Sequence, residues 1–351
     1  MKKVVNPSNL VPGMKVAQTI LNDFGSIIIS ENTILDEHLI KKLQNQKLLK
    51  VRIFVEKEKS KEEKIDIPVT KVKDAFQNTY NGGIYEVKEI ISDLLSEKGV
   101  NLKNVANVID SVISMTDEKM DLIRCMNQIK SSDEYIYTHS MNVAMLSMLI
   151  GRWLRYNDKK LQMLVQAALL HDIGKIKVPP EIINKPGKVT DSEYEEIKKH
   201  SIYGYRMLEK EKAISKDVCL GVLLHHERED GSGYPTGAKS NLIHDFAKII
   251  AVADIYDAMT SERVYKERES PFEVFELMEE KTLRQLDVKV VSAFLNNIAS
   301  YYVGDYVELD NGKIAEIVYI NPRHVSKPII KVDEKYIDLV IEKNIKIKYV
   351  I

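Results

Sequence analysis

The sequence holds only two cysteines, Cys125 and Cys219, and neither belongs to a CxxC pair. Cysteine-rich zinc modules and small disulfide-stapled domains need more thiols than this, so both classes are excluded. The two cysteines lie among apolar residues in segments with helical spacing, which predicts core thiols rather than a disulfide or a ligand pair. Free thiols of this kind are typical of a reducing compartment, and we therefore predict a cytoplasmic location.

Long apolar runs are also missing. The best candidate for a membrane span, residues 141–154, is shorter than the roughly 18 residues that a span requires and contains Asn142 and Arg152. The N-terminal segment begins with two lysines after Met1 but lacks the apolar core of a signal peptide.

Neither charge sign is in excess, because the chain has 51 lysines and arginines and 52 aspartates and glutamates. Neither a membrane nor a nucleic acid polymer is therefore expected as a partner.

The remaining composition is that of a globular protein. Apolar residues make up 44% of the 351 residues and charged residues 29%, which is enough for the cores of two or three domains. Shifts in pattern along the chain predict mainly α structure in four segments. These are a small mixed α/β domain at 1–60, a charged linker with connecting helices at 61–119, a helical bundle at 120–300 and a small β extension at 301–351.

Local signals within these segments predict where elements begin and end. Gly174 follows a helical apolar stripe and is expected to cap the end of that helix. Thr190 and Glu193 form a capping-box pattern, which predicts the start of another helix. The Asn-Gly-Gly run at 81–83 is expected to separate two helices, and the Asn-Gly pair at 311–312 predicts a β-hairpin.

Histidines gather in the helical segment. Three of the eight, His38, His244 and His324, stand in polar or turn-like settings and are expected at the surface. The other five lie at helix positions or helix ends, and two aspartates share their apolar surroundings. These seven residues are His139, His171, Asp172, His200, His225, His226 and Asp254.

Each of these seven side chains alone is most often a core residue with one hydrogen bond. Together in one bundle they cannot all be buried without partners, because unpaired buried polar groups are costly. A pair of divalent cations would satisfy them at once, and imidazole and carboxylate ligands suit iron, manganese or zinc. The lack of cysteine ligands argues against a structural zinc site.

Two pairs among the seven are adjacent in the sequence, His171 with Asp172 and His225 with His226. Neighbouring side chains on a helix point about 100° apart, so an adjacent pair cannot bind one cation from a single helix face. Such a pair can instead serve two cations that lie close together. A carboxylate has two oxygens, and we therefore predict that Asp172 bridges the two cations.

Three motifs in this region resemble those of HD-GYP domains, an extended branch of the HD phosphohydrolase superfamily. They are HDIGK at 171–175, HHEREDGSGYP at 225–235 and DIYDAMTSERVYK at 254–266, and the resemblance covers about residues 120–300. A second His-Asp pair, at 244–245, is not assigned to the motif because the expected apolar helix does not precede it. The resemblance implies an HD-type helical bundle and phosphodiesterase activity on cyclic di-GMP, a bacterial second messenger.

The resemblance also implies that all seven residues are metal ligands. Some members of the family hold a third metal through a glutamate four residues before the first histidine. Here that position is Tyr135, and Glu134 is one residue out of register. We therefore expect two divalent metal ions per chain, iron or manganese, rather than three.

Contacts with the substrate follow from the same resemblance. Lys175 corresponds to the phosphate-binding lysine of the family and is expected to act in catalysis together with Asp172. Asp257 corresponds to a carboxylate that supports a metal ligand. The expected substrate contacts are Lys175, Tyr234, Arg263 and Lys266.

The expected reaction is attack of a metal-bridging hydroxide on a phosphodiester, giving linear pGpG and, after a second cut, GMP. Two alternatives remain open. Another cyclic dinucleotide, such as 3′,3′-cyclic GMP-AMP, can be the substrate, because nothing in the sequence separates guanine from adenine at one half of the ligand. The domain can also bind cyclic di-GMP as a signalling scaffold with little hydrolysis.

The flanking segments carry less information. The N-terminal segment resembles the small domain that often precedes HD-GYP domains, and it contains no haem or nucleotide motif. The C-terminal hairpin is expected to act as a structural brace. The helices within residues 84–130 can pair between subunits, which leaves a homodimer open.

Overall fold

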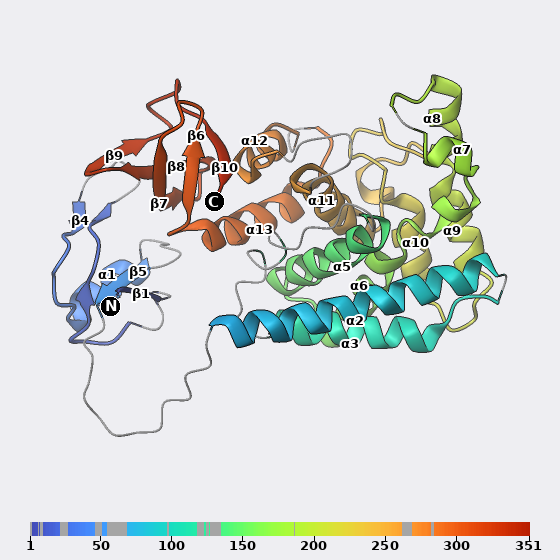
Figure 1. Cartoon of the computed structure of the whole chain (residues 1–351), viewed down its shortest axis with the longest axis horizontal. Helices are drawn as coiled ribbons and strands as arrows, with labels where there is room; N and C mark the ends of the chain where they lie inside the picture. The colour runs from blue at the N-terminus through green and yellow to red at the C-terminus, as the bar shows by residue number, and fades with distance from the viewer. Residues whose placement is uncertain are drawn as a thin grey trace. The chain divides into compact units, whose positions relative to one another are not determined.

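The structure is a computed structural model of the whole chain, drawn in Figure 1. It describes all residues except 1, 6, 8–9, 22–26, 46–50, 55–68, 97, 118–122, 124–125, 127–134, 186, 262–268 and 282–283. The chain forms two compact units, one from Met1–Asp66 together with Ile298–Ile351 and the other from Ile67–Asn297. The division into four segments, with bounds at residues 60, 119 and 300, stays a prediction.

The N-terminal part of the first unit contains short strands and one helix. Its elements are β1 (Lys2–Val5), β2 (Lys15–Val16), β3 (Ile20–Leu21), β4 (Ile27–Ile29), α1 (Glu37–Asn45) and β5 (Val51–Phe54). Strand β5 lies between β1 and β2 in an antiparallel sheet, and β3 pairs with β4. Val51 and Ile53 of β5 are buried, and they join Ile40 and Leu43 of α1 in a small core of their own.

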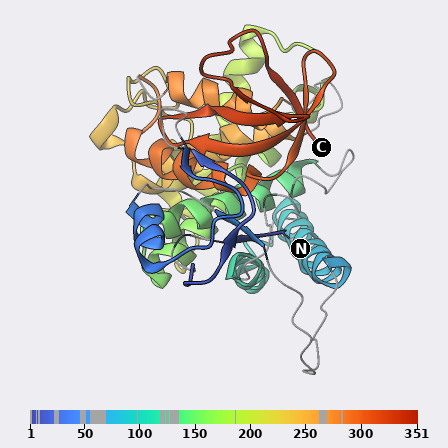
Figure 2. The ribbon, with the colours of Figure 1, turned by 90° about the vertical axis from the view of Figure 1, so that its left-hand side faces the viewer.

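The C-terminal part of the first unit is a five-stranded antiparallel sheet, whose strands are red in Figure 2. Its elements are η4 (Ala299–Tyr302), β6 (Tyr306–Leu309), β7 (Ile314–Asn321), β8 (His324–Val332), β9 (Lys335–Asp338) and β10 (Ile347–Val350). The strand order is β10-β6-β7-β8-β9. The predicted hairpin is confirmed, because β6 pairs with β7 across a turn in which Gly312 has a φ of 78°. Arg52 of β5 pairs with Glu316 of β7, which joins the two parts of this unit.

Helices are the only regular secondary structure among the described residues of the second unit. They are α2 (Val69–Leu95), α3 (Leu102–Asp117), α5 (Tyr135–Trp153), α6 (Asp158–Leu170), η2 (Ile173–Lys177), α7 (Pro180–Ile183), α8 (Asp191–Lys198), α9 (His200–Leu208), α10 (Lys216–Leu224), η3 (Ser240–Leu242), α11 (Asp245–Thr260), α12 (Pro271–Lys281) and α13 (Val288–Ile298). With the small sheet at the C-terminus, they confirm the predicted mainly α fold class. None of the helices in the described part of the chain is long and apolar enough to cross a membrane.

Helix α5 lies at the centre of the second unit. Its residues 138–150 are all buried, and it packs against α2, α3, α6 and α11 (Figure 1). A helix buried on every side needs apolar residues around most of its circumference, and the sequence of α5 provides them. Polar side chains on such a helix therefore face other protein groups rather than water.

Capping residues determine where several of these helices begin. The capping box predicted for α8 is confirmed, with Thr190 accepting from the backbone of Glu193 and Glu193 accepting from the backbone of Thr190. Asn157 at the start of α6 and Ser215 at the start of α10 each accept one backbone hydrogen bond through the side chain, without a capping box. Because the start of each helix is anchored, its last turn falls at a defined position in the unit.

The predicted break at residues 81–83 is wrong, because α2 continues through all three residues from Val69 to Leu95. A Cβ atom at Gly83 would collide with the side chain of Met141 on α5. Gly83 therefore allows α2 to approach α5 closely, and this contact outweighs the low helix propensity of glycine. The sequence pattern of this segment fits both a turn and a close helix–helix contact, and it does not distinguish between them.

Gly174 is not the helix cap that the pattern predicted. Helix α6 ends at Leu170, and Gly174 lies inside η2 with a backbone conformation outside the left-handed region. A Cβ atom at this position would collide with the backbone of His200 and Gly204. Glycine is needed here because η2 packs directly on the first turn of α9, next to His200.

We expect Gly174→Ala to destabilise the protein by about 2–3 kcal/mol, since backbone atoms cannot move aside as a flexible side chain can. The matched control is Gly82→Ala on α2, where no described atom lies within 4 Å of the added Cβ and alanine favours the helix by about 0.5–1 kcal/mol. Urea denaturation of both variants measures the difference. Equal midpoints for Gly174→Ala and the wild type would contradict the packing argument.

Candidate metal centre

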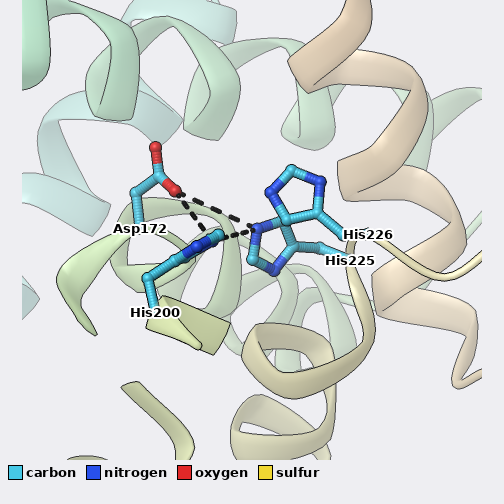
Figure 3. A group of neighbouring side chains, drawn as sticks. All are labelled: Asp172, His200, His225 and His226. Atoms are coloured by element: carbon cyan, nitrogen blue, oxygen red, sulfur yellow. Dashed lines mark hydrogen bonds and ion pairs between the residues drawn. The ribbon is translucent and has the colours of Figure 1, made fainter. Parts of the chain in front are cut away.

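The ends of several helices bring the seven predicted ligands together. The residues come from α5 (His139), the end of α6 (His171 and Asp172), the start of α9 (His200), the end of α10 (His225 and His226) and α11 (Asp254). They form two groups in which one donor atom from each residue lies within 4.8 Å of the others. One group is Asp172, His200, His225 and His226, shown in Figure 3, and the other is His139, His171 and Asp254.

Asp172 faces both groups. Its Oδ2 atom lies 3.4 Å from Nε2 of His171 and 3.6 Å from Nε2 of His139. Its Oδ1 atom lies 3.4 Å from Nε2 of His200 and 4.0 Å from Nε2 of His225. One carboxylate oxygen is therefore directed to each group, which is the arrangement that a bridging ligand requires.

Three of the histidines share the same backbone hydrogen bond. In each, Nδ1 lies 2.7 Å from the carbonyl oxygen of the residue three positions earlier. The pairs are His171 with Ala168, His200 with Ile197, and His225 with Val222. A carbonyl oxygen only accepts, so Nδ1 donates its proton and the neutral ring directs the lone pair of Nε2 into the site. This is the tautomer that binds a metal ion through Nε2.

Burial keeps several of these rings neutral. It lowers the pKa of His226 to about 3, and it lowers the pKa of His200 and of His225 as well. At neutral pH these three imidazoles are therefore unprotonated at their second nitrogen. Neutral imidazole is the form that coordinates a metal ion.

His139 and the carboxylates behave differently. Burial lowers the pKa of His139, but hydrogen bonds with Asp254 and Asp257 outweigh it and raise that pKa to about 9. Burial would raise the pKa of Asp172, but the positive charge of Lys175 holds it well below its usual range. Burial acts on Asp254 in the same direction, and the hydrogen bond with His139 nevertheless keeps its pKa below the usual value. Both predicted carboxylate ligands are thus ionised.

Unpaired acceptor atoms indicate that a cation fits this cluster. Among the described residues, Nε2 of His171 and Oδ1 of Asp172 are buried and have no hydrogen-bond partner. Nε2 of His200 lies 3.3 Å from Nε2 of His225, so two lone pairs face each other. Buried acceptors without donors are costly, and a cation between them would supply the missing partner. The donor set of imidazole nitrogens and carboxylate oxygens fits divalent metal ions.

Lys175 lies between the cluster and an open cavity. Its Nζ atom donates to Oδ2 of Asp172 at 2.5 Å, and its side chain remains partly exposed. A cavity of about 250 Å³ adjoins both residues and is lined mainly by apolar side chains of α2, α5 and α7, such as Ile90, Ile136 and Ile183. The predicted phosphate-binding lysine therefore has space beside it for a ligand.

Tyr234, a predicted substrate contact, lies against two histidines of the cluster. Its ring stacks on His226, with the centroids 4.6 Å apart, and it meets the ring of His200 edge-on. Burial raises the pKa of the Tyr234 phenol, so the hydroxyl stays neutral and able to donate a hydrogen bond.

Glu227 anchors the loop that carries Tyr234, and the sequence reasoning did not single it out. It is buried directly after the histidine pair, and its Oε1 atom accepts from the backbone nitrogen of Thr236 at 2.6 Å and from its hydroxyl at 2.8 Å. The available signal was its place in the HHE motif. Glu227 therefore ties the loop to the end of α10.

Asp257 is hydrogen-bonded to His139, and its role in supporting a metal ligand stays a prediction. Its Oδ2 atom accepts from Nδ1 of His139 at 2.7 Å, and its Oδ1 atom accepts from Asn142 at 2.8 Å and from Ser261 at 3.0 Å. From the sequence alone, Asn142 was interpreted only as a polar residue that argues against a membrane span. A buried amide within an otherwise apolar helix was the signal for this second role.

Several residues named from the sequence lie away from the site, and others are not among the residues that the structure describes. His38 and His324 are exposed, as predicted, whereas His244 is half-buried because it caps the start of α11. None of the three belongs to the two groups found among the described residues. Cys219 is a buried free thiol, which confirms the prediction of a core thiol for this cysteine. The predicted substrate contacts Arg263 and Lys266 lie outside the described residues, as do Cys125, Glu134 and the side chain of Tyr135. The expected number of metals is therefore still a prediction.

The buried groups of histidines and aspartates in this helical unit are of the kind that can hold metal ions. Residues 124–290 match the HD domain family. This part of the chain is thus similar to HD domains, and the resemblance inferred from the three motifs is confirmed.

Two curated relatives show how far the similarity extends. The chain is 34% identical to a cyclic di-GMP phosphodiesterase of Pseudomonas aeruginosa over 249 residues, which are 70% of this chain and 59% of that protein. It is 36% identical to the 3′3′-cGAMP-specific phosphodiesterase 1 of Vibrio cholerae over 188 residues, 53% of this chain and 43% of that protein. The chain thus spans about half the length of these relatives.

A solved structure supports the fold. The HDG"Y"P protein of Bdellovibrio bacteriovorus matches with a TM-score of 0.53 at 18% identity, over 85% of this chain and 99% of that chain. At this identity the match shows a shared fold.

Proposed function

We propose that this chain is a metal-dependent phosphodiesterase that hydrolyses cyclic di-GMP to pGpG, to GMP or to both. The observation that carries the proposal is the pair of ligand groups joined by Asp172, with buried acceptor atoms that need a cation. The activity named for the Pseudomonas aeruginosa relative supports the same reaction.

The seven residues of the two groups would hold two divalent ions, iron or manganese. When bound, such ions polarise a phosphodiester oxygen and lower the pKa of a water molecule so that a nucleophile exists near neutral pH. The chain prepares the site for them through the backbone hydrogen bonds of its histidines, which orient Nε2, and through Asp172, which faces both groups.

Lys175 and Tyr234 would bind the substrate. The Nζ atom of Lys175 lies beside Asp172 and can offset negative charge on the phosphoryl oxygens as it develops. The neutral hydroxyl of Tyr234 can donate to another oxygen of the ligand. The adjoining cavity offers room for the part of the dinucleotide that flanks the reacting phosphate.

Lys175→Met is expected to lower kcat/KM about 100-fold while metal content stays unchanged, because in the proposed mechanism the lysine would contact the substrate phosphate and would not bind metal. Lys177→Met is the matched control, since Lys177 lies exposed on the same short helix. Steady-state kinetics and metal analysis of both variants measure the effect. Loss of bound metal in Lys175→Met would show that the lysine acts on the cluster instead.

A second candidate substrate is 3′,3′-cyclic GMP-AMP, because the relative from Vibrio cholerae is named for it.

One experiment distinguishes these possibilities. Protein purified without oxygen should be analysed for iron, manganese and zinc, then incubated with both dinucleotides. Appearance of pGpG or GMP from cyclic di-GMP supports the proposal, and faster turnover of cyclic GMP-AMP favours the second substrate. Cyclic di-GMP that binds to the metal-loaded protein and stays uncut for hours would support the signalling scaffold.

A further inference from the structure

Helix α2 contributes a hydrogen bond to the interior of the site, although it precedes the residues 124–290 that match the HD family. Tyr80 of α2 is 1% exposed, and its hydroxyl lies 2.7 Å from Oδ1 of Asn142 on α5. Asn142 in turn donates from Nδ2 to Oδ1 of Asp257 at 2.8 Å. Asp257 accepts from Nδ1 of His139 at 2.7 Å. A continuous buried path of three hydrogen bonds thus connects α2 with a predicted metal ligand.

The direction of each hydrogen bond in this path is determined by its neighbours. The carboxylate of Asp257 only accepts, so the amide of Asn142 must present its NH2 group to it. The amide oxygen then faces Tyr80, whose hydroxyl donates to it. At the far end Nδ1 of His139 donates to Asp257, so Nε2 is the nitrogen that a metal ion would bind in place of a proton. The donor of Tyr80 therefore favours the one amide orientation that supports His139.

Packing holds Tyr80 in this position. Gly83, one turn further along α2, lets the helix lie directly against Met141 of α5. The ring of Tyr80 also stacks against Phe76, with the centroids 5.8 Å apart. These apolar contacts do not depend on the hydroxyl, so removal of the oxygen alone tests the hydrogen bond without emptying the core.

We propose that Tyr80 is a positioning residue for His139 and that α2 is thereby a functional part of the metal centre. The inference rests on the proposed metal binding and goes beyond it, because it extends the site to a helix outside the family match. Without the hydroxyl, Oδ1 of Asn142 loses its partner in this path, and the amide is held only by its hydrogen bond to Asp257. The carboxylate of Asp257, and with it His139, would then be less firmly positioned.

The test uses Tyr80→Phe in the full-length chain. The matched control is Tyr85→Phe, the same chemical change on the same helix at a side chain that is 63% exposed. Metal-free proteins are titrated with Mn²⁺, and free Mn²⁺ is followed by electron paramagnetic resonance without substrate. We expect one of the two Mn²⁺ sites to bind about 3- to 10-fold more weakly in Tyr80→Phe, the range that one lost hydrogen bond predicts, and no change in Tyr85→Phe.

A double-mutant cycle with Asn142→Leu tests whether Tyr80 acts through Asn142, because this substitution removes the amide that links Tyr80 to Asp257. Adding Tyr80→Phe to Asn142→Leu should weaken Mn²⁺ binding no further. A purely structural role would instead lower the melting temperature and leave Mn²⁺ affinity unchanged at temperatures where the variant is folded. Wild-type affinity in Tyr80→Phe, or the same fold loss in both backgrounds, would overturn the inference.

The measurement also separates this inference from the proposed function, because it needs no catalysis. A wild-type chain that takes up no Mn²⁺ would overturn the metal centre itself and this inference with it. Normal Mn²⁺ binding without turnover of any dinucleotide would overturn the proposed reaction and leave the result for Tyr80 valid.

Discussion

Asp172→Ala is expected to lower phosphodiesterase turnover by about 1,000-fold or more and to release bound metal. The carboxylate is the only group that faces both ligand groups, with one oxygen toward each, in the described part of the site. Its removal takes a ligand from both proposed metals and leaves the Nζ atom of Lys175 without its partner. Metal analysis of the purified variant and product formation from cyclic di-GMP measure the two effects.

Asp245→Ala is the matched control, because Asp245 belongs to the other His-Asp pair of the chain. Its side chain is 62% exposed, and among the described residues it contacts Lys160 and Tyr156, so its loss should change stability by less than about 1 kcal/mol. Metal content and turnover should stay at the wild-type level. Near wild-type activity in a metal-depleted Asp172→Ala protein would contradict the proposed mechanism.

Metal removal should lower the melting temperature markedly. A cation that binds only the folded state stabilises it by about 2.7 kcal/mol when its free concentration is about 100 times the dissociation constant. For a folding unit of the size of Ile67–Asn297, that energy corresponds to a shift of roughly 5–10 °C. Thermal unfolding of chelator-treated protein, with and without added Mn²⁺, measures the shift.

The Asp172→Ala variant serves as the control for that shift. Because it lacks the bridging carboxylate, we expect Mn²⁺ to raise its melting temperature little or not at all. A shift of equal size in the variant and the wild type would mean that Mn²⁺ binds elsewhere on the chain. Absence of a shift in the wild type would argue against a metal centre in the helical unit.

The seven residues that the structure brings together were predictable because their signals are local. His171 and His225 each follow a helix of apolar residues, and each has a polar neighbour in the sequence. A buried helix that ends in two adjacent polar residues must direct them to a common interior, where they need a partner. The bridging position predicted for Asp172 agrees with the placement of its two oxygens, although its metal ligation stays a proposal.

The two glycines that were misread show where local pattern fails. Gly83 looked like part of a turn and Gly174 like a helix cap, yet each allows a close contact with another helix. Glycine has the same sequence signature in both situations, because the missing Cβ serves a turn and a tight contact equally well. The distinction depends on Met141 in the first case and on the backbone of His200 in the second.

The sequence by itself determined the helical class, the caps, the C-terminal hairpin and the identity of the seven clustered residues. Each of these depends on side chains a few positions apart, and such spacings are visible in the chain. Only the tertiary structure decided which oxygen of Asp172 faces which histidines and how Tyr80 reaches His139 through Asn142 and Asp257. The path from Tyr80 joins residues up to 177 positions apart across three helices, and no local spacing encodes contacts of that kind because they arise only when the helices pack.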